Sequence, residues 1–165
     1  MIALDLQTFR QNRESGTVTG VIYVDLESGA FPDVGWSDFP VIILGWWAAA
    51  LVELDVPQKR EVLWRFMDGP HSLTLTKVAG GKLGFAQVQS SLLEAAERVV
   101  AYCEQHRMIG PDLEPLRGSI HGLKANKPVQ RTGASRFRLR QMQHRCRLAP
   151  VADLCVRRFL ASPVN

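Results

Sequence analysis

The longest uninterrupted apolar stretch of the chain lies between Phe39 and Val52, where no side chain is charged or strongly polar. It is too short to cross a membrane as a helix, which takes about 20 residues. Ser37 or Asp38 is expected to cap the first turn of a helix here, and Pro40 is tolerated because its missing N–H group needs no partner at that position. Spacings of three and four residues predict a central helix that turns one apolar face to the core: Phe39, Ile42, Ile43, Trp46, Trp47, Ala50, Leu51 and Leu54.

Alternation of apolar and polar residues predicts strands on both sides of this helix. Residues 17–25 are rich in β-branched side chains, and a turn after them is expected to bring Phe31 back alongside. Later in the chain, turn sequences rich in glycine separate further alternating segments, and consecutive hairpins of this kind form an antiparallel sheet with one face in solvent. These later strands are predicted at residues 61–67, 71–77 and 83–89.

A second helix is expected to begin at Ser91, because Ser91 and Glu94 have the spacing of a capping box. Leu113 to Leu123 has the periodicity of a short further helix, although a proline and a glycine interrupt it. The order of elements predicts an α+β fold: an antiparallel sheet of about four to five strands with two helices packed on one face.

Charge divides the chain into two parts. The 165 residues include 20 Lys or Arg and 16 Asp or Glu, a net charge of +4. Residues 1–123 contain ten basic and fifteen acidic residues, a balance of −5, whereas residues 124–165 contain ten basic residues against Asp153 alone, a balance of +9. We therefore predict an acidic α+β domain over residues 1–123 and a basic, partly disordered tail over residues 124–165, in which residues 151–160 have the pattern of a short helix.

Cysteine usage and the N-terminal sequence favour a cytoplasmic protein without membrane association. The first residues have neither the basic segment nor the apolar run of a signal peptide. Three irregularly spaced cysteines are typical of reduced thiols. A zinc site formed by His144, Cys146 and Cys155 is a minor alternative, because zinc ligands are usually more closely paired. We predict no metal site and no cofactor.

The motifs of the common enzyme classes are missing from the sequence. A phosphate-binding loop at Gly80-Gly81-Lys82 would need an earlier glycine where Thr76 stands, so a hairpin turn is the better interpretation. Asp68 and His71 flank a turn at a strand end, where acid–base groups often occur. An aspartate that bonds to its own turn amides explains Asp68 equally well. We predict that the protein is not an enzyme.

A set of motifs between residues 16 and 109 resembles a group of small bacterial proteins that carry FPxxxWxDF, a WW-containing helix and an FMDGP-type strand end. We associate this group with immunity proteins, which neutralise polymorphic or contact-dependent toxins. The resemblance implies a non-catalytic protein-binding protein whose partner is a cognate toxin, and it implies no catalytic residues. The matching residues here are Phe31-Pro32-Asp33, Trp36, Asp38-Phe39, Leu44, Trp46-Trp47 and Phe66-Met67-Asp68-Gly69-Pro70.

Four residues of these motifs are the expected partner contacts: Asp33, Trp36, Asp38 and Asp68. An acidic surface with aromatic residues suits a basic partner such as a nuclease, because opposite electrostatic fields speed association. Loop and helix-cap roles would also account for Asp33 and Asp38.

The basic tail supports a second hypothesis, a nucleic-acid-associated regulator. Its arginines alternate with apolar residues and could follow a phosphate backbone. A solvated tail, or one that docks on the acidic domain, is the simpler interpretation of such a segment. The residues that the hypothesis would use are Arg136, Arg138, Arg140, Arg145 and Arg147.

Overall fold

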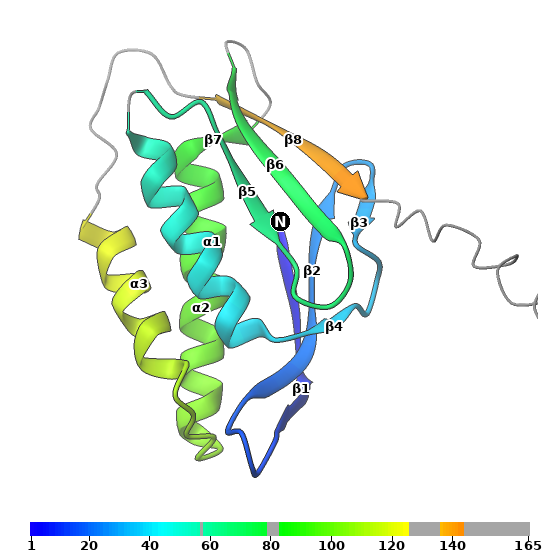
Figure 1. Ribbon diagram of the computed structural model, residues 1–165, viewed down its shortest axis with the longest axis vertical. Coiled ribbons are helices and arrows are strands. Elements are labelled where there is room, and N and C mark those ends of the chain that lie inside the picture. Colours follow the sequence, from blue (N-terminus) through cyan, green and yellow to red (C-terminus); the bar gives the residue numbers. More distant parts are fainter. Residues whose placement is uncertain (57, 79–82, 126–135, 144–165) are drawn as a thin grey trace, which may run out of the picture.

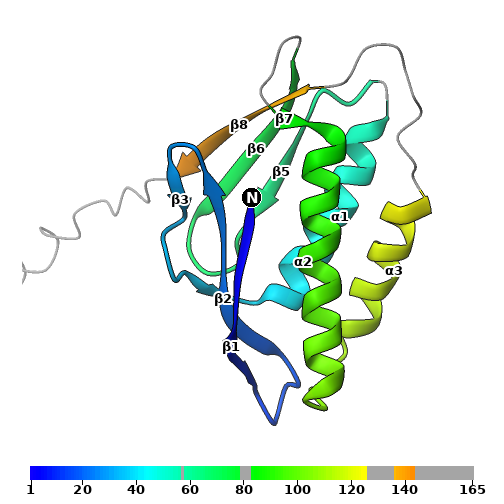
Figure 2. The ribbon, with the colours of Figure 1, turned by 180° about the vertical axis from the view of Figure 1, so that it is seen from behind.

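The residues that the structure describes form an α+β fold with two antiparallel sheets and three helices (Figure 1), which confirms the predicted fold class. The computed structural model describes residues 1–56, 58–78, 83–125 and 136–143. The helices gather on one side of the molecule and the strands on the other, as the opposite views show (Figures 1 and 2). The helices are α1 (Pro40–Asp55), α2 (Phe85–Gln105) and α3 (Leu113–Ala125).

The first sheet is built around β2, which pairs with β1 on one side and with β3 and β4 on the other. The predicted strand at residues 17–25 and the turn that returns Phe31 are confirmed, since Leu26 pairs with Gly29. Strand β1 was not predicted. Its Phe9 ring lies against Gly20 of β2, where a Cβ atom would come within 2.3 Å of the ring. The strands are β1 (Ile2–Gln11), β2 (Val18–Leu26), β3 (Gly29–Phe31) and β4 (Ser37–Asp38).

The second sheet has the strand order β5-β6-β8-β7, and all its pairings are antiparallel. The predicted hairpin of the strands at 61–67 and 71–77 is confirmed as β5 and β6. Val62, Trp64 and Phe66 are buried together, as their alternation requires. The strands are β5 (Glu61–Arg65), β6 (His71–Val78), β7 (Leu83–Gly84) and β8 (Arg136–Gln143).

The predicted boundary at residue 123 is wrong, because α3 continues to Ala125 and part of the predicted tail forms β8. β8 pairs with the whole of β6, and its Phe137 side chain is only 1% exposed. Apolar residues that alternate with arginines are also the pattern of a half-buried strand, which explains why this basic segment joins the sheet. The predicted helix at 151–160 lies outside the described residues.

The predicted strand at residues 83–89 and the capping box at Ser91 are also wrong. α2 already begins at Phe85, and only Leu83 and Gly84 pair as a strand, with β8 rather than with β6. Phe85, Val88 and Leu92 are buried at helical spacing, so the apolar stripe of α2 extends further back than the capping signal. Packing of this stripe against the core outweighs a local cap of about 1 kcal/mol.

The central helix α1 packs against α2 and α3 as well as against β2 and β5. Phe39, rather than Ser37 or Asp38, is its N-cap residue, and Pro40 occupies the first turn as predicted. Part of the predicted core face is correct. Trp46, however, is 49% exposed, and the buried face extends instead over Val41, Leu44 and Ala48. The residues of α1 that are buried are Pro40, Val41, Ile43, Leu44, Trp47, Ala48, Leu51 and Leu54.

Among the described residues, no helix is both long and apolar enough to span a membrane.

Candidate functional site

A tight turn from Asp33 to Trp36 forms the first part of the candidate site. The N–H group of Trp36 donates to the carbonyl oxygen of Asp33 (3.3 Å), and Gly35 has a φ of 77°. A glycine suits this position because a type II turn needs a positive φ at its third residue. The Asp33 carboxylate accepts a hydrogen bond from the N–H group of Val34 (2.8 Å). Both Asp33 and Val34 remain exposed, Val34 at 73%.

The turn between β5 and β6 forms the second part. The N–H group of Phe66 donates to the carbonyl oxygen of His71 (3.1 Å) and closes the loop that contains Met67 and Asp68. Gly69 has a φ of 80°, and a Cβ atom on it would lie 3.0 Å from the His71 ring. Met67 is 42% exposed and Asp68 is exposed. The turn therefore presents an apolar and an acidic side chain to solvent.

Asp38 joins these two turns through its carboxylate, although its side chain is only 2% exposed. One carboxylate oxygen accepts a hydrogen bond from the N–H group of Phe39 (2.8 Å). The other accepts from the N–H groups of Met67 (3.0 Å) and Asp68 (3.3 Å) and from the indole N–H of Trp36 (3.3 Å). Hydrogen bonds to an ionised acceptor are stronger than neutral ones. The Asp38 carboxylate thus fixes the positions of both turns.

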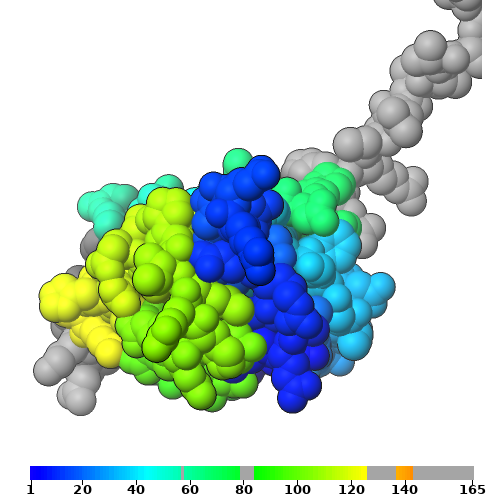
Figure 3. Space-filling view, turned by 90° about the horizontal axis from the view of Figure 1, so that it is seen from below, coloured from blue at the N-terminus to red at the C-terminus, as the bar shows by residue number. Residues whose placement is uncertain are grey.

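Burial removes Asp38 from the predicted set of direct partner contacts. Asp33, Trp36 and Asp68 remain at the surface, where Trp36 is partly buried and the two aspartates are exposed. Sequence reasoning missed Val34 and Met67, whose exposure depends on how the turns fold. We refer to Asp33, Val34, Trp36, Met67 and Asp68 together as the Trp36 surface. The segment that carries β3 and β4 lies on the opposite side of the molecule from α3 (Figure 3).

His71 supports the Trp36 surface from beneath. Its ring lies edge-on to Trp36, with centroids 4.7 Å apart, and to Phe31 at 5.9 Å. Its Nδ1 atom is buried and has no hydrogen-bond partner among the described residues. His71 and Asp68 are both described residues, and no hydrogen bond or ion pair links their side chains. The two side chains therefore do not form the joined acid–base pair that the spacing left open.

The described residues also bear on metal binding and thiol chemistry. No cluster of three or more His, Cys, Asp or Glu side chains has the spacing to hold a metal ion there. Cys103 is buried in the core, and this burial, together with the nearby Glu104 charge, raises the pKa of its thiol. A thiol with a raised pKa is a poor nucleophile at neutral pH. The minor zinc alternative at His144, Cys146 and Cys155 lies outside the described residues.

The arginines of the second hypothesis are divided by the structure. Arg136, Arg138 and Arg140 belong to β8, and both Arg138 and Arg140 are exposed. Arg138 is registered with Thr76 and Arg140 with Thr74, on the sheet face opposite the buried Phe137. Arg145 and Arg147 lie outside the described residues. The two basic side chains of this set whose exposure the structure describes, Arg138 and Arg140, therefore lie on one face of the second sheet.

Comparisons of this chain with protein-family models, with curated proteins and with solved structures found no match.

Proposed function

We propose that this chain is a non-catalytic protein-binding protein, an immunity protein that neutralises a toxin by covering its working surface. The observation that carries this proposal is the Trp36 surface. Two exposed apolar side chains, Val34 and Met67, stand next in sequence to two exposed carboxylates, Asp33 and Asp68, on turns that a buried carboxylate fixes. Apolar anchors on a preorganised backbone bind well, because little conformational freedom is lost on binding.

The charges of this surface favour a basic toxin, such as a nuclease. The two carboxylates would increase the rate of encounter with a positively charged partner, and this effect would decrease with salt. We assign the protein to the cytoplasm, where it would meet a toxin that acts inside the cell. The motif resemblance at Trp36, Phe66 and Met67 supports the same proposal.

The direct test is protection of bacteria from a toxin encoded beside the gene of this protein. The toxin is expressed from an inducible promoter with wild-type protein, with a variant that carries Asp33→Lys and Asp68→Lys, or with a control that carries Glu14→Lys and Glu94→Lys. Both variants change the net charge equally at exposed positions, but only the first alters the Trp36 surface. We expect growth with the wild type and the control, and loss of growth with the first variant.

The protein–protein complex is measured in parallel by calorimetry with purified, catalytically inactive toxin. We expect the double substitution at Asp33 and Asp68 to weaken binding at least about tenfold, or about 1.4 kcal/mol. If the Asp33/Asp68 variant protected as well as the Glu14/Glu94 control and bound the toxin with equal affinity, the Trp36 surface would be ruled out as the toxin-binding site. Failure of the wild type to protect against the adjacent toxin, or to bind it, would contradict the immunity function itself.

A second candidate function, binding of nucleic acid, is favoured by the exposed arginines of β8. Arg138 and Arg140 share a sheet face with Arg65 of β5, since the register pairs Arg65 with Ser72 and Thr74 with Arg140. Such a face could contact phosphates. Binding of single-stranded DNA that weakens steeply with salt, and that is lost in the Arg138→Glu, Arg140→Glu variant, would favour this function. Salt-independent or absent binding would exclude it.

A further inference from the structure

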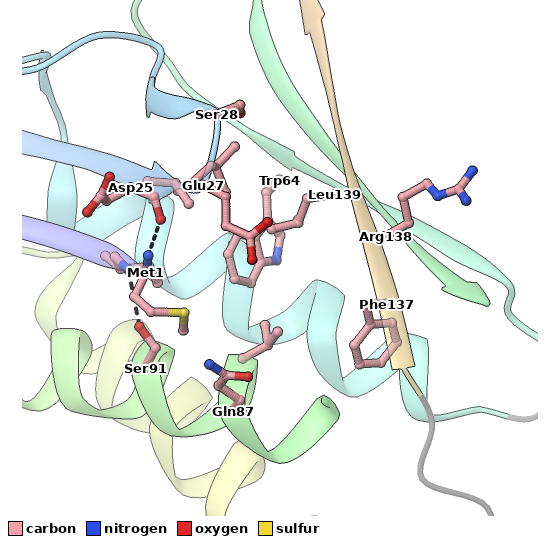
Figure 4. Close-up of a pocket in the computed structure, with 14 residues that line it drawn as sticks. Met1, Asp25, Glu27, Ser28, Trp64, Gln87, Ser91, Phe137, Arg138 and Leu139 are labelled. Atoms are coloured by element: carbon pink, nitrogen blue, oxygen red, sulfur yellow. Dashed lines mark hydrogen bonds between the residues drawn. The ribbon is translucent and has the colours of Figure 1, made fainter. Parts of the chain in front are cut away.

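A cleft of about 650 Å³ opens between the two sheets (Figure 4). One wall is the end of β2 and the turn that follows it, the other is β8, and the first turns of α2 form the floor. The indole of Trp64 lies between the two walls. A cleft of this size with a mainly apolar lining is typical of a binding site. The apolar residues of the lining include Val24, Leu26, Trp64, Val88, Phe137 and Leu139.

Beyond Phe137, β8 is an edge strand of the second sheet. β6 pairs with β8 along its full length, but on the other side β7 meets only Arg136 and Phe137. From Arg138 to Gln143, no described strand pairs with this outer edge. Three consecutive residues of β8, from Phe137 to Leu139, line the cleft, although the Arg138 side chain points away from it (Figure 4). The backbone of β8 therefore borders the cleft.

An unpaired strand edge is a template for another strand, because alternate residues leave N–H and C=O groups without a sheet partner. The two faces of β8 set different requirements for such a strand. Phe137 and Leu139 face the cleft, where the added strand would bury apolar side chains. Arg138 and Arg140 are exposed on the opposite face, where acidic side chains would pair with them across the strands.

We propose that the β8 edge binds an extended peptide segment of a partner protein in which apolar and acidic residues alternate. The apolar side chains enter the cleft and the acidic ones face Arg138 and Arg140. A second copy of this chain fits less well, because pairing β8 with itself about a twofold axis would place arginines against arginines. The site goes beyond the proposed immunity function and does not depend on it, since it shares no residue with the Trp36 surface.

The test uses synthetic peptides with blocked ends and the full-length protein. One peptide of about seven residues alternates Val and Glu, a length that fits a typical strand. A second alternates Val and Lys, and two further Val/Glu peptides carry N-methyl groups on alternate residues, in one register or the other. N-methylation removes main-chain donors while keeping the side chains. Calorimetry gives the affinities, and amide hydrogen exchange of residues 138–142 locates the bound peptide.

We expect the Val/Glu peptide to bind at least about tenfold more tightly than the Val/Lys peptide, since opposite-charge and like-charge cross-strand pairs differ in sign. One N-methylation register should abolish binding and the other should retain it, because only one set of N–H groups faces β8. Exchange of outward N–H groups in β8 should slow on binding.

Charge reversal provides the matched control. The Arg138→Glu, Arg140→Glu variant should prefer the Val/Lys peptide, whereas an Arg13→Glu, Arg107→Glu control with the same net charge should keep the original preference. The proposal would be overturned by no binding of the Val/Glu peptide at about millimolar concentration, by equal effects of both N-methyl registers, or by an unchanged preference in the β8 variant. None of these results depends on whether the protein neutralises a toxin.

Discussion

The carboxylate of Asp38 brings together two segments that are separate in the sequence: residues 36–39, through the indole of Trp36 and the N–H group of Phe39, and the turn at Met67 and Asp68. Its burial means that it organises the Trp36 surface without being part of the exposed surface. A buried charge is stable only when its acceptor sites are filled, and here four N–H groups fill them. The position of one side chain therefore decides the geometry of two surface turns.

Replacing Asp38 by asparagine should destabilise the protein. The amide keeps the size of the side chain but turns an NH₂ group toward N–H donors, so that buried donors lose their acceptor. We expect a loss of about 1–3 kcal/mol in the free energy of unfolding, measured by urea denaturation. The matched change Asp33→Asn, in an exposed turn where asparagine makes the same local bond, should stay within about 0.5 kcal/mol. Equal losses in both variants would contradict the proposed role of Asp38.

Replacement by alanine should change the stability of the protein in opposite directions at two glycines. Gly69 has a φ of 80° and lies beside the His71 ring, so Gly69→Ala should cost about 1–2 kcal/mol. Gly118 lies within α3, and a Cβ atom there meets nothing within 4 Å. Gly118→Ala should therefore stabilise the helix by up to about 1 kcal/mol. Thermal unfolding of both variants tests this difference, which would fail if the two changes had the same sign.

At the scale of elements, α1 shows how packing selects between adjacent residues of the same type. The indole of Trp47 stacks on that of Trp64, with centroids 4.9 Å apart. Each indole N–H also donates to a backbone carbonyl, Trp47 to Arg65 (2.9 Å) and Trp64 to Trp47 (3.2 Å). Trp46 points away from this arrangement and is 49% exposed. Trp47, and not Trp46, therefore packs α1 against β5.

Truncation of the two tryptophans to alanine should therefore have unequal effects. Trp47→Ala removes a fully buried indole and should cost about 3–5 kcal/mol in the free energy of unfolding. Trp46→Ala should cost no more than about 1 kcal/mol, because the side chain is half exposed. Chemical denaturation followed by circular dichroism measures both without relying on tryptophan fluorescence. Comparable losses would show that the core face of α1 is assigned incorrectly.

At the scale of the whole molecule, β8 connects a distant part of the chain to the core. It pairs with β6 along its length, and Phe137 packs on Phe85, with ring centroids 5.7 Å apart. Because these contacts join residues far apart in sequence, they form only when the rest of the sheet is in place. We therefore expect the fold to require residues beyond the acidic part of the chain.

A chain that ends at residue 125 should lose cooperative unfolding, because it lacks the strand that covers the edge of β6 and the buried Phe137 side chain. A chain that ends at residue 143 keeps all the described strands and helices and should unfold cooperatively. Thermal melts followed by circular dichroism, with NMR spectra as a check on packing, compare the two chains. If both showed the same midpoint, β8 would not be part of the folding unit.

Features that depend on neighbouring residues were predicted correctly, whereas features that depend on contacts between distant residues were not. The strand 17–25, the β5–β6 hairpin and the presence of a helix with Pro40 in its first turn were predicted because local patterns and turn residues specify them. The start of α2 was misplaced because burial of Phe85 and Val88 against the core outweighed the signal of a capping box. Asp33 and Asp68 are exposed and Trp36 is partly exposed, so their role as partner contacts stays a prediction. The burial of Asp38 was not foreseen, because it depends on the turn at Met67 and Asp68, which lies about 30 residues away in the sequence.

The sequence by itself determined the fold class, the positions of β2, β5 and β6, the presence of helices in the regions of α1, α2 and α3, and the turn that carries Asp68, since these depend on the periodicity and conformational preferences of neighbouring residues. The tertiary structure alone decided which segments distant from one another in the sequence meet. It placed β8 beside β6, brought Met67 and Asp68 to the Asp38 carboxylate, and opened the cleft between the two sheets. These contacts depend on long-range strand pairing and side-chain packing, which a local pattern in one segment does not specify.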